Sequence, residues 1–238
     1  MVITVMQYSP QSASEQNRID YISCQARAVA VEVLIRTQRK SIYSGRPIHR
    51  YQHETHTVFS WGWHRTTQSN KAAGRSFMVR GAAMLAVTQV YETPPELSDR
   101  LAGLRLKGVN GGVAFFAASI PPHGSMQSKP YALTLDTFVK WLRSPLNVLG
   151  HRSMPFLCMD MDVQLGWVRT YDGGMESHMR SVVGPYGHGV AHLAAKQVRA
   201  FDLELDLCAM LTQARSRAPF YRAIGIQTYM DQVVVLVR

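Results

Sequence analysis

The feature that most constrains the fold is a run of short apolar segments between residues 77 and 120, separated by strong turn signals. The interruptions are Pro94-Pro95, Gly108 and the triplet Asn110-Gly111-Gly112. An Asn-Gly doublet between apolar segments is typical of a β-hairpin. We therefore predict an antiparallel meander of four strands, at 77–80, 84–90, 101–107 and 113–120.

Outside this run the apolar pattern alternates between strand and helix character. Further strands are predicted at 2–6, 31–35, 155–159 and 233–237. Helices are predicted from residue 14, near 131–142 and over 190–210, and hairpins and loops over 43–70. This order of elements indicates an α/β fold.

Length and charge set limits on the class of protein. A chain of 238 residues with 46% hydrophobic and 18% charged residues can bury a substantial core, and we predict a single domain over 1–238. The formal net charge is +10 and the sequence pI is about 9.8. Such a surface attracts polyanions, so nucleic acid is the expected partner.

The cysteines and the lengths of the apolar segments indicate where in the cell the protein is located. Cys24, Cys158 and Cys208 are odd in number, far apart and each within an apolar stretch, which indicates reduced thiols without a disulfide partner. No window reaches the length of a transmembrane helix, and the first residues lack a secretion signal. We expect no membrane association and an intracellular location, cytoplasmic or nuclear.

Two acids follow the predicted strand at 155–159. Asp160 and Asp162 are separated by one residue, at the end of an apolar run. Carboxylates at a strand end are a common ligand set for Mg²⁺, which keeps waters that phosphate oxygens can replace. The alternative is a strand that ends in solvated acids, and spacing alone favours this alternative.

A basic and aromatic segment between residues 46 and 75 has two interpretations of equal weight. It could contact phosphates and stack on bases, or it could be a solvated basic loop whose tryptophans belong to the core. Its cationic members are Arg46, His49, Arg50, His53, His56, His64, Arg65, Lys71 and Arg75, and its aromatic members are Tyr51, Trp61 and Trp63.

His188 and His192 are four residues apart, as two metal ligands on one helix face would be. Glycines flank His188 on both sides, which indicates a loop, and no nearby Glu completes a zinc motif. A zinc site is therefore not favoured.

The order of several segments resembles the endonuclease/exonuclease/phosphatase superfamily, in particular its retrotransposon-associated endonuclease-like domains. The segments are GLRLK at 103–107, GVAFFAASIPP at 112–122, PFLCMDMD at 155–162 and GPYGHG at 184–189. The resemblance covers nearly the whole chain. It implies a four-layer α/β/β/α sandwich of two mixed sheets, and hydrolysis of phosphodiesters with Mg²⁺ or Mn²⁺ at one end of the sandwich.

The family's site residues are only partly matched. Asp160 keeps the acid that the family uses near the metal and the reacting water, and Asp162 stands where the family has Asn. Arg36 stands where the family has a metal-binding Glu, and a guanidinium cannot ligate Mg²⁺. Ser119 replaces the family's Tyr.

The remaining family positions are also substituted. The closing Asp of the family falls on Val233, and the Asn of the first strand falls near Met6 or Gln7. The final strand and catalytic His of the family would follow Arg238, so the sandwich is expected to be incomplete at its C-terminal edge. His188 is the histidine that remains as a catalytic candidate.

Together these features predict a fold of metal-dependent nucleases with impaired hydrolysis, which is a pseudoenzyme. The alternatives are a non-catalytic nucleic-acid-binding domain and a retrotransposon-derived relic. The predicted nucleic-acid contacts are Arg36, Arg46, Arg50, Arg65 and Lys71. Asp160 and Asp162 are the predicted catalytic remnants, and Asp160 is the predicted metal ligand.

Overall fold

A computed structural model describes the chain in separate ranges: residues 5–8, 30–35, 37, 48–62, 74–108, 111–119, 128–149, 153–160, 207–209, 221–223, 226–228 and 231–236. The chain divides into two compact units. Unit 1 is Met1–Ser119 with Asp136–Met154, and unit 2 is Ile120–Leu135 with Pro155–Arg238. The single domain over 1–238 stays a prediction.

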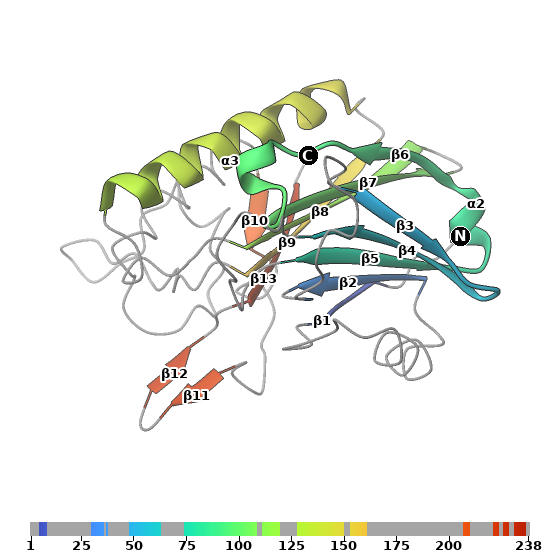
Figure 1. Ribbon diagram of the computed structural model, residues 1–238, viewed down its shortest axis with the longest axis horizontal. Coiled ribbons are helices and arrows are strands. Elements are labelled where there is room, and N and C mark those ends of the chain that lie inside the picture. The colour runs from blue at the N-terminus through green and yellow to red at the C-terminus, as the bar shows by residue number, and fades with distance from the viewer. Residues whose placement is uncertain are drawn as a thin grey trace. The chain divides into compact units, whose positions relative to one another are not determined.

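Unit 1 contains a five-stranded sheet with the order β1-β2-β5-β4-β3 (Figure 1). Its strands are β1 (Val5–Tyr8), β2 (Val31–Ile35), β3 (Ile48–Gln52), β4 (His56–Trp61) and β5 (Arg75–Arg80). β1 and β2 are parallel and the other pairs are antiparallel, so the sheet is mixed. Every residue of β4 and β5 is buried, as expected for central strands covered on both faces.

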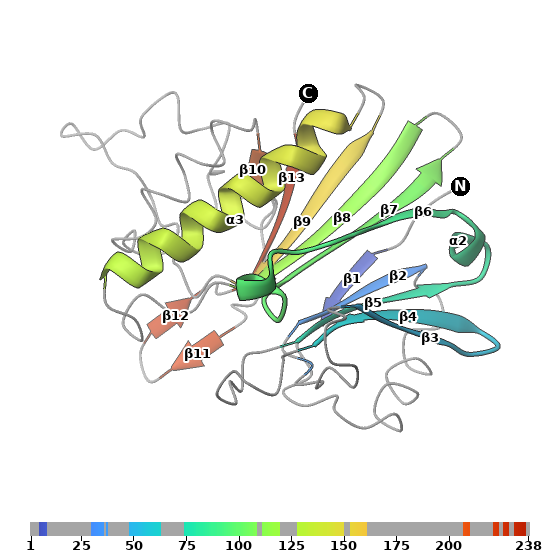
Figure 2. The same cartoon turned by 45° about the horizontal axis from the view of Figure 1, so that its top comes forward.

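The prediction that 77–80 belongs to the meander is wrong, because this segment lies in β5 and pairs with β2 and β4 in the five-stranded sheet. The other three predicted strands belong to the second sheet of unit 1 (Figure 2). Its strands are β6 (Val87–Tyr91), β7 (Leu101–Gly108) and β8 (Gly111–Ser119). The pairs β6–β7 and β7–β8 are antiparallel, and Gly108 pairs with Gly111 at the predicted hairpin. The short 3-10 helix η1 (Pro95–Leu97) lies between β6 and β7.

The strand expected at 84–90 begins later than predicted. Helix α2 (Ala82–Leu85) comes first, and β6 starts at Val87. Gly81, with φ of 52°, turns the chain out of β5, and the four residues after it are good helix formers.

The two sheets of unit 1 pack face to face, with contacts between β2 and β8 and between β5 and β7. Helix α3 (Ser128–Val148), whose residues from Asp136 onward belong to unit 1, covers the other face of the meander. The Phe116 ring contacts Trp141 of α3 edge to face, with centroids 5.8 Å apart. Strand alternation directs Phe115 to the opposite face, and both rings are buried.

Unit 2 contains β9 (Met154–Asp160), which starts at the last residue of unit 1, and β10 (Leu207–Ala209) and β13 (Asp231–Leu236). β13 is antiparallel to both β9 and β10. A separate hairpin consists of β11 (Tyr221–Ala223) and β12 (Ile226–Thr228).

The helix predicted over 190–210 is wrong at its end, because Leu207–Ala209 is a strand. Leucines at 203, 205 and 207 alternate with acidic residues, and this period of two is typical of a strand. Because the whole segment is rich in apolar residues, the change from a helical period to a period of two was not recognised.

The prediction of an α/β fold with two packed sheets is confirmed, and the five-stranded sheet is mixed. The helix expected from residue 14 lies outside the described residues. Among the helices within the described ranges, none is both long and apolar enough to cross a membrane.

Candidate functional site

The ends of four strands of unit 1 are joined by backbone hydrogen bonds. The Thr37 amide, after β2, donates to the Gly74 carbonyl oxygen over 3.0 Å, and the Gly74 amide donates to the Asp99 carbonyl oxygen over 2.8 Å. The Ser119 amide, at the end of β8, donates to the Arg100 carbonyl oxygen over 2.9 Å. These bonds bring both sheets to one edge. We call its members the strand-end rim: Thr37, Gly74, Arg75, Asp99, Arg100 and Ser119.

Gly74 is the junction of this rim. Its φ of 87° lies in the left-handed region, which favours glycine. Its carbonyl oxygen accepts from the Thr37 amide and also from Nη1 of Arg75, at 2.5 Å. The Arg75 side chain is fully buried, and a guanidinium keeps its charge at every physiological pH. Arg75 therefore places a permanent cation next to the Gly74 carbonyl oxygen.

Several polar groups of the rim and of the connection between β6 and β7 are buried. Thr37, Thr93 and Ser119 are buried hydroxyl residues. The Oγ1 atoms of Thr37 and Thr93 and the Nη1 atom of Arg100 have no hydrogen-bond partner among the residues that the structure describes. A buried donor without a partner lowers the stability of the fold. This edge therefore favours water, or a ligand that offers acceptor oxygens.

Two positions that the resemblance expects at the site are at the rim or next to it in the chain. Ser119 is itself a rim residue. Arg36 lies outside the described residues, but its neighbours are described: Ile35 pairs with Arg75, and Thr37 is bound to Gly74. Three arginines are thus close in the chain to these hydrogen bonds. Arg100 accepts one of them, Arg36 precedes Thr37, and Arg75 follows Gly74.

Unit 2 holds an acidic pair that the sequence analysis missed. Asp160 is the last residue of β9, and its backbone lies directly opposite Asp231, the first residue of β13. The resemblance placed the closing Asp position at Val233, which pairs with Cys158. The available signal was an acid two residues before the apolar run at 233–237, whereas Asp160 comes at the end of its apolar run.

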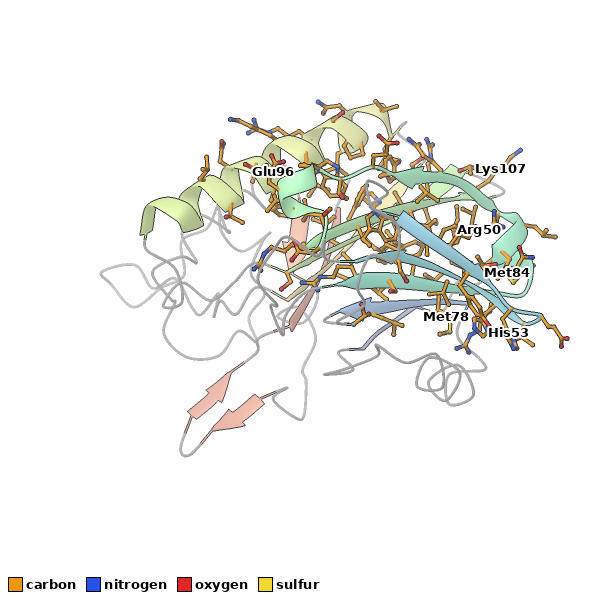
Figure 3. The ribbon with its side chains drawn as sticks, viewed as in Figure 1. Arg50, His53, Met78, Met84, Glu96 and Lys107 are labelled. Carbon is orange, nitrogen blue, oxygen red and sulfur yellow. The ribbon has the colours of Figure 1, made fainter. Side chains whose placement is uncertain are left out.

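The basic and aromatic segment is partly buried. Arg50 is exposed on the edge strand β3 (Figure 3), with its guanidinium carbon 5.7 Å from the centroid of the Phe59 ring and Nη2 donating to Gln52 Oε1 over 3.4 Å. His56 and Trp61 are buried. The core alternative is therefore correct for Trp61, which cannot stack on a base.

Other predicted site residues lie outside the described residues: Arg36, Arg46, Arg65, Lys71, Asp162 and His188. Within the described part of the chain, no three His, Cys, Asp or Glu residues are grouped so that they could hold a metal ion. The paired backbone positions of Asp160 and Asp231 bring together two residues of the type that binds Mg²⁺ or Mn²⁺.

Comparisons with known proteins match the fold to nucleases. An AP endonuclease from Archaeoglobus fulgidus has a TM-score of 0.60 and 15% identity over 99% of this chain and 87% of that chain. The 3'-5' exonuclease NExo from Neisseria meningitidis has 0.60 and 14%, over 99% and 86%. The endonuclease domain of TRAS1, a telomere-specific non-LTR retrotransposon, has 0.52 and 11%, over 98% and 84%.

No protein-family model matches the chain, and no curated protein matches it. Identities this low concern the fold alone. The chain therefore has the α/β fold of these nucleases.

Proposed function

We propose that this chain binds the phosphodiester backbone of nucleic acid and that its hydrolytic chemistry is impaired. The likeness to nucleases supports nucleic acid as the ligand class. The likeness to TRAS1 supports ancestry in a retrotransposon-type endonuclease domain. The formal net charge of +10 supports binding to a polyanion.

The observation that carries the proposal is the convergence of arginine-bearing segments at the strand-end rim. Arg36 stands where the resemblance expects a metal-binding carboxylate, and backbone hydrogen bonds join its neighbour Thr37 to Gly74 and Gly74 to Asp99. Guanidinium groups bind phosphate oxygens in bidentate geometry. We assign the phosphate contacts to Arg36 and Arg100, and a structural role to the buried Arg75.

Impaired hydrolysis follows from the same positions. A cation at 36 cannot hold Mg²⁺, and Ser119 replaces an aromatic hydroxyl. Loss of one general acid or base lowers a rate by roughly 100- to 10,000-fold, and loss of a metal ligand adds to this. Binding of phosphate without efficient cleavage is the expected outcome.

Filter binding of the full chain to duplex DNA and single-stranded RNA over a salt series tests the binding proposal. Log affinity should fall linearly with log salt, and Arg100→Ala should flatten the slope on duplex DNA by about 0.9 for one lost phosphate contact. Arg36→Glu should flatten the slope and weaken binding at every salt concentration. Arg143→Ala removes the same charge from an exposed position on α3 and is the matched control.

Equal effects of Arg143→Ala and Arg100→Ala would mean that general charge, and not the rim, binds the nucleic acid. No binding at low salt by the parent chain would refute the proposed function and favour the relic.

A second candidate function is residual metal-dependent hydrolysis, favoured by the opposed backbone positions of Asp160 and Asp231. Like charges directly opposite on two strands are destabilising unless a cation or proton compensates them. Asp160 and Asp231 are the residues that would hold Mg²⁺. When bound, the metal would supply Lewis-acid stabilisation of charge on the phosphate.

Nicking of supercoiled plasmid with and without Mg²⁺ tests the second candidate. We expect little or no nicking above a buffer blank. Rapid Mg²⁺-dependent nicking that is lost in both Asp160→Ala and Asp231→Ala would establish hydrolysis. It would overturn the proposal that hydrolysis is impaired. Loss in Asp160→Ala alone would show that Asp231 has no part in it.

A further inference from the structure

Two tryptophans from different layers of unit 1 hold the end of β6. Nε1 of Trp61, on β4, donates to the Tyr91 carbonyl oxygen over 3.3 Å. Nε1 of Trp141, on α3, donates to the Glu92 carbonyl oxygen over 2.7 Å. Two consecutive carbonyl groups at a strand end are thus bound by side chains from the five-stranded sheet and from the helix.

The side chains around these bonds are closely packed. The Phe116 ring lies 5.3 Å from the Tyr91 ring and 5.8 Å from the Trp141 ring, centroid to centroid. A Cβ atom added at Gly103 would lie 2.9 Å from Cδ2 of Tyr91, so this strand position accepts no larger residue without movement. The contact with Phe116 and the hydrogen bond to the Glu92 carbonyl oxygen together hold the Trp141 indole in place.

The chain that follows Glu92 leads directly to the rim. The Leu97 amide donates to the Pro94 carbonyl oxygen and the Arg100 amide to the Leu97 carbonyl oxygen, each over 2.9 Å. Leu97 is buried, while Glu96 of η1 is exposed (Figure 3). The connection from Glu92 to Arg100 is therefore bound at its start by the tryptophans, in its middle by η1 and at its end by the rim.

We propose that Trp141 is a positioning residue for Arg100, acting through its hydrogen bond to Glu92 and the connection that follows. This rests on the proposed function, in which Arg100 contacts phosphate. The expected role is not general stability alone: releasing the Glu92 carbonyl loosens the start of the connection, and the Arg100 guanidinium loses its fixed place at the rim.

The experiment combines Trp141→Phe, which keeps most of the ring but removes the N–H donor, with Arg100→Ala in a double-mutant cycle. Trp141→Phe alone should flatten the salt slope on duplex DNA by up to about 0.9, as Arg100→Ala does. In the Arg100→Ala background it should change the slope no further. Leu146→Val, a core change on the same helix, is the stability control.

Equal flattening by Leu146→Val, or an additive effect of Trp141→Phe in the Arg100→Ala background, would overturn the positioning role. An unchanged slope in Trp141→Phe would overturn it as well.

Hydrogen exchange separates this inference from the proposed function. In Trp141→Phe, the amides of Leu97, Arg100 and Ser119 should exchange at least several-fold faster, while amides in the middle of β7 keep their parent rates. This readout needs no nucleic acid. If the parent chain fails to bind nucleic acid, the proposed function falls, and selective exchange would still show that Trp141 orders the connection. Unchanged exchange at these amides would refute the ordering of the connection by Trp141 and, with it, the positioning of Arg100.

Discussion

At the scale of single residues, Gly74 has a backbone conformation that restricts which residue can occupy its position. An L-residue at its φ of 87° is strained, so Gly74→Ala should lower the free energy of unfolding by about 1–2 kcal/mol. Because both backbone groups of Gly74 join rim segments, nucleic-acid binding should weaken as well. Gly81→Ala imposes comparable strain at φ of 52° beside α2 and should lower stability while leaving binding intact. Urea unfolding and filter binding measure the two effects. A Gly74→Ala variant as stable as the parent would contradict the assigned backbone role.

At the scale of elements, local patterns predicted strands well where the pattern was complete. The predicted strand at 31–35 coincides with β2, and the hairpin glycines placed the turn between β7 and β8 correctly. Errors arose where tertiary contacts decide. The sequence left the burial of Trp61 open, because its partners Phe77 and Tyr91 are distant in the chain. The pairing of Asp231 with Asp160 depends on strand register, which no local pattern encodes.

The same division holds for the candidate site. The resemblance supplied predictions for positions 36 and 119, and of these Ser119 lies within the described residues. Gly74 and Asp99 could not, since they contribute backbone N–H and C=O groups whose partners are set only by folding. Thr37 is adjacent to the assigned position and was missed for the same reason.

At the scale of the whole molecule, the two compact units either unfold together or separately. Cys158 in unit 2 is buried, and burial raises the pKa of its thiol to about 12. At pH 8 the folded thiol is therefore protonated and unreactive, and alkylation requires opening. If residues 1–238 form one domain, Cys158 should become alkylated at the urea concentration at which β7 and β8 amides lose protection. Peptide mapping separates Cys158 from Cys24 and Cys208. Two distinct midpoints would disprove the single domain.

The sign of the pH effect follows from the same thiol. Because the folded state holds its proton more tightly than the unfolded chain, this group contributes full stability below the ordinary thiol pKa of 9.0. That contribution declines as pH rises from there toward about 12, so the midpoints should be compared at one pH below 9.

The backbone construction of the strand-end rim has an evolutionary consequence. Its hydrogen bonds run between main-chain amides and carbonyls of Thr37, Gly74, Asp99, Arg100 and Ser119, and most of them would survive replacement of the side chains. An acid and an arginine can therefore replace one another at position 36 without disturbing these backbone hydrogen bonds. Gly74 is the exception, because its conformation restricts the residue. In such an architecture catalysis can decay over generations while the scaffold persists, and a lineage can pass from cutting a polymer to holding it by few inherited steps.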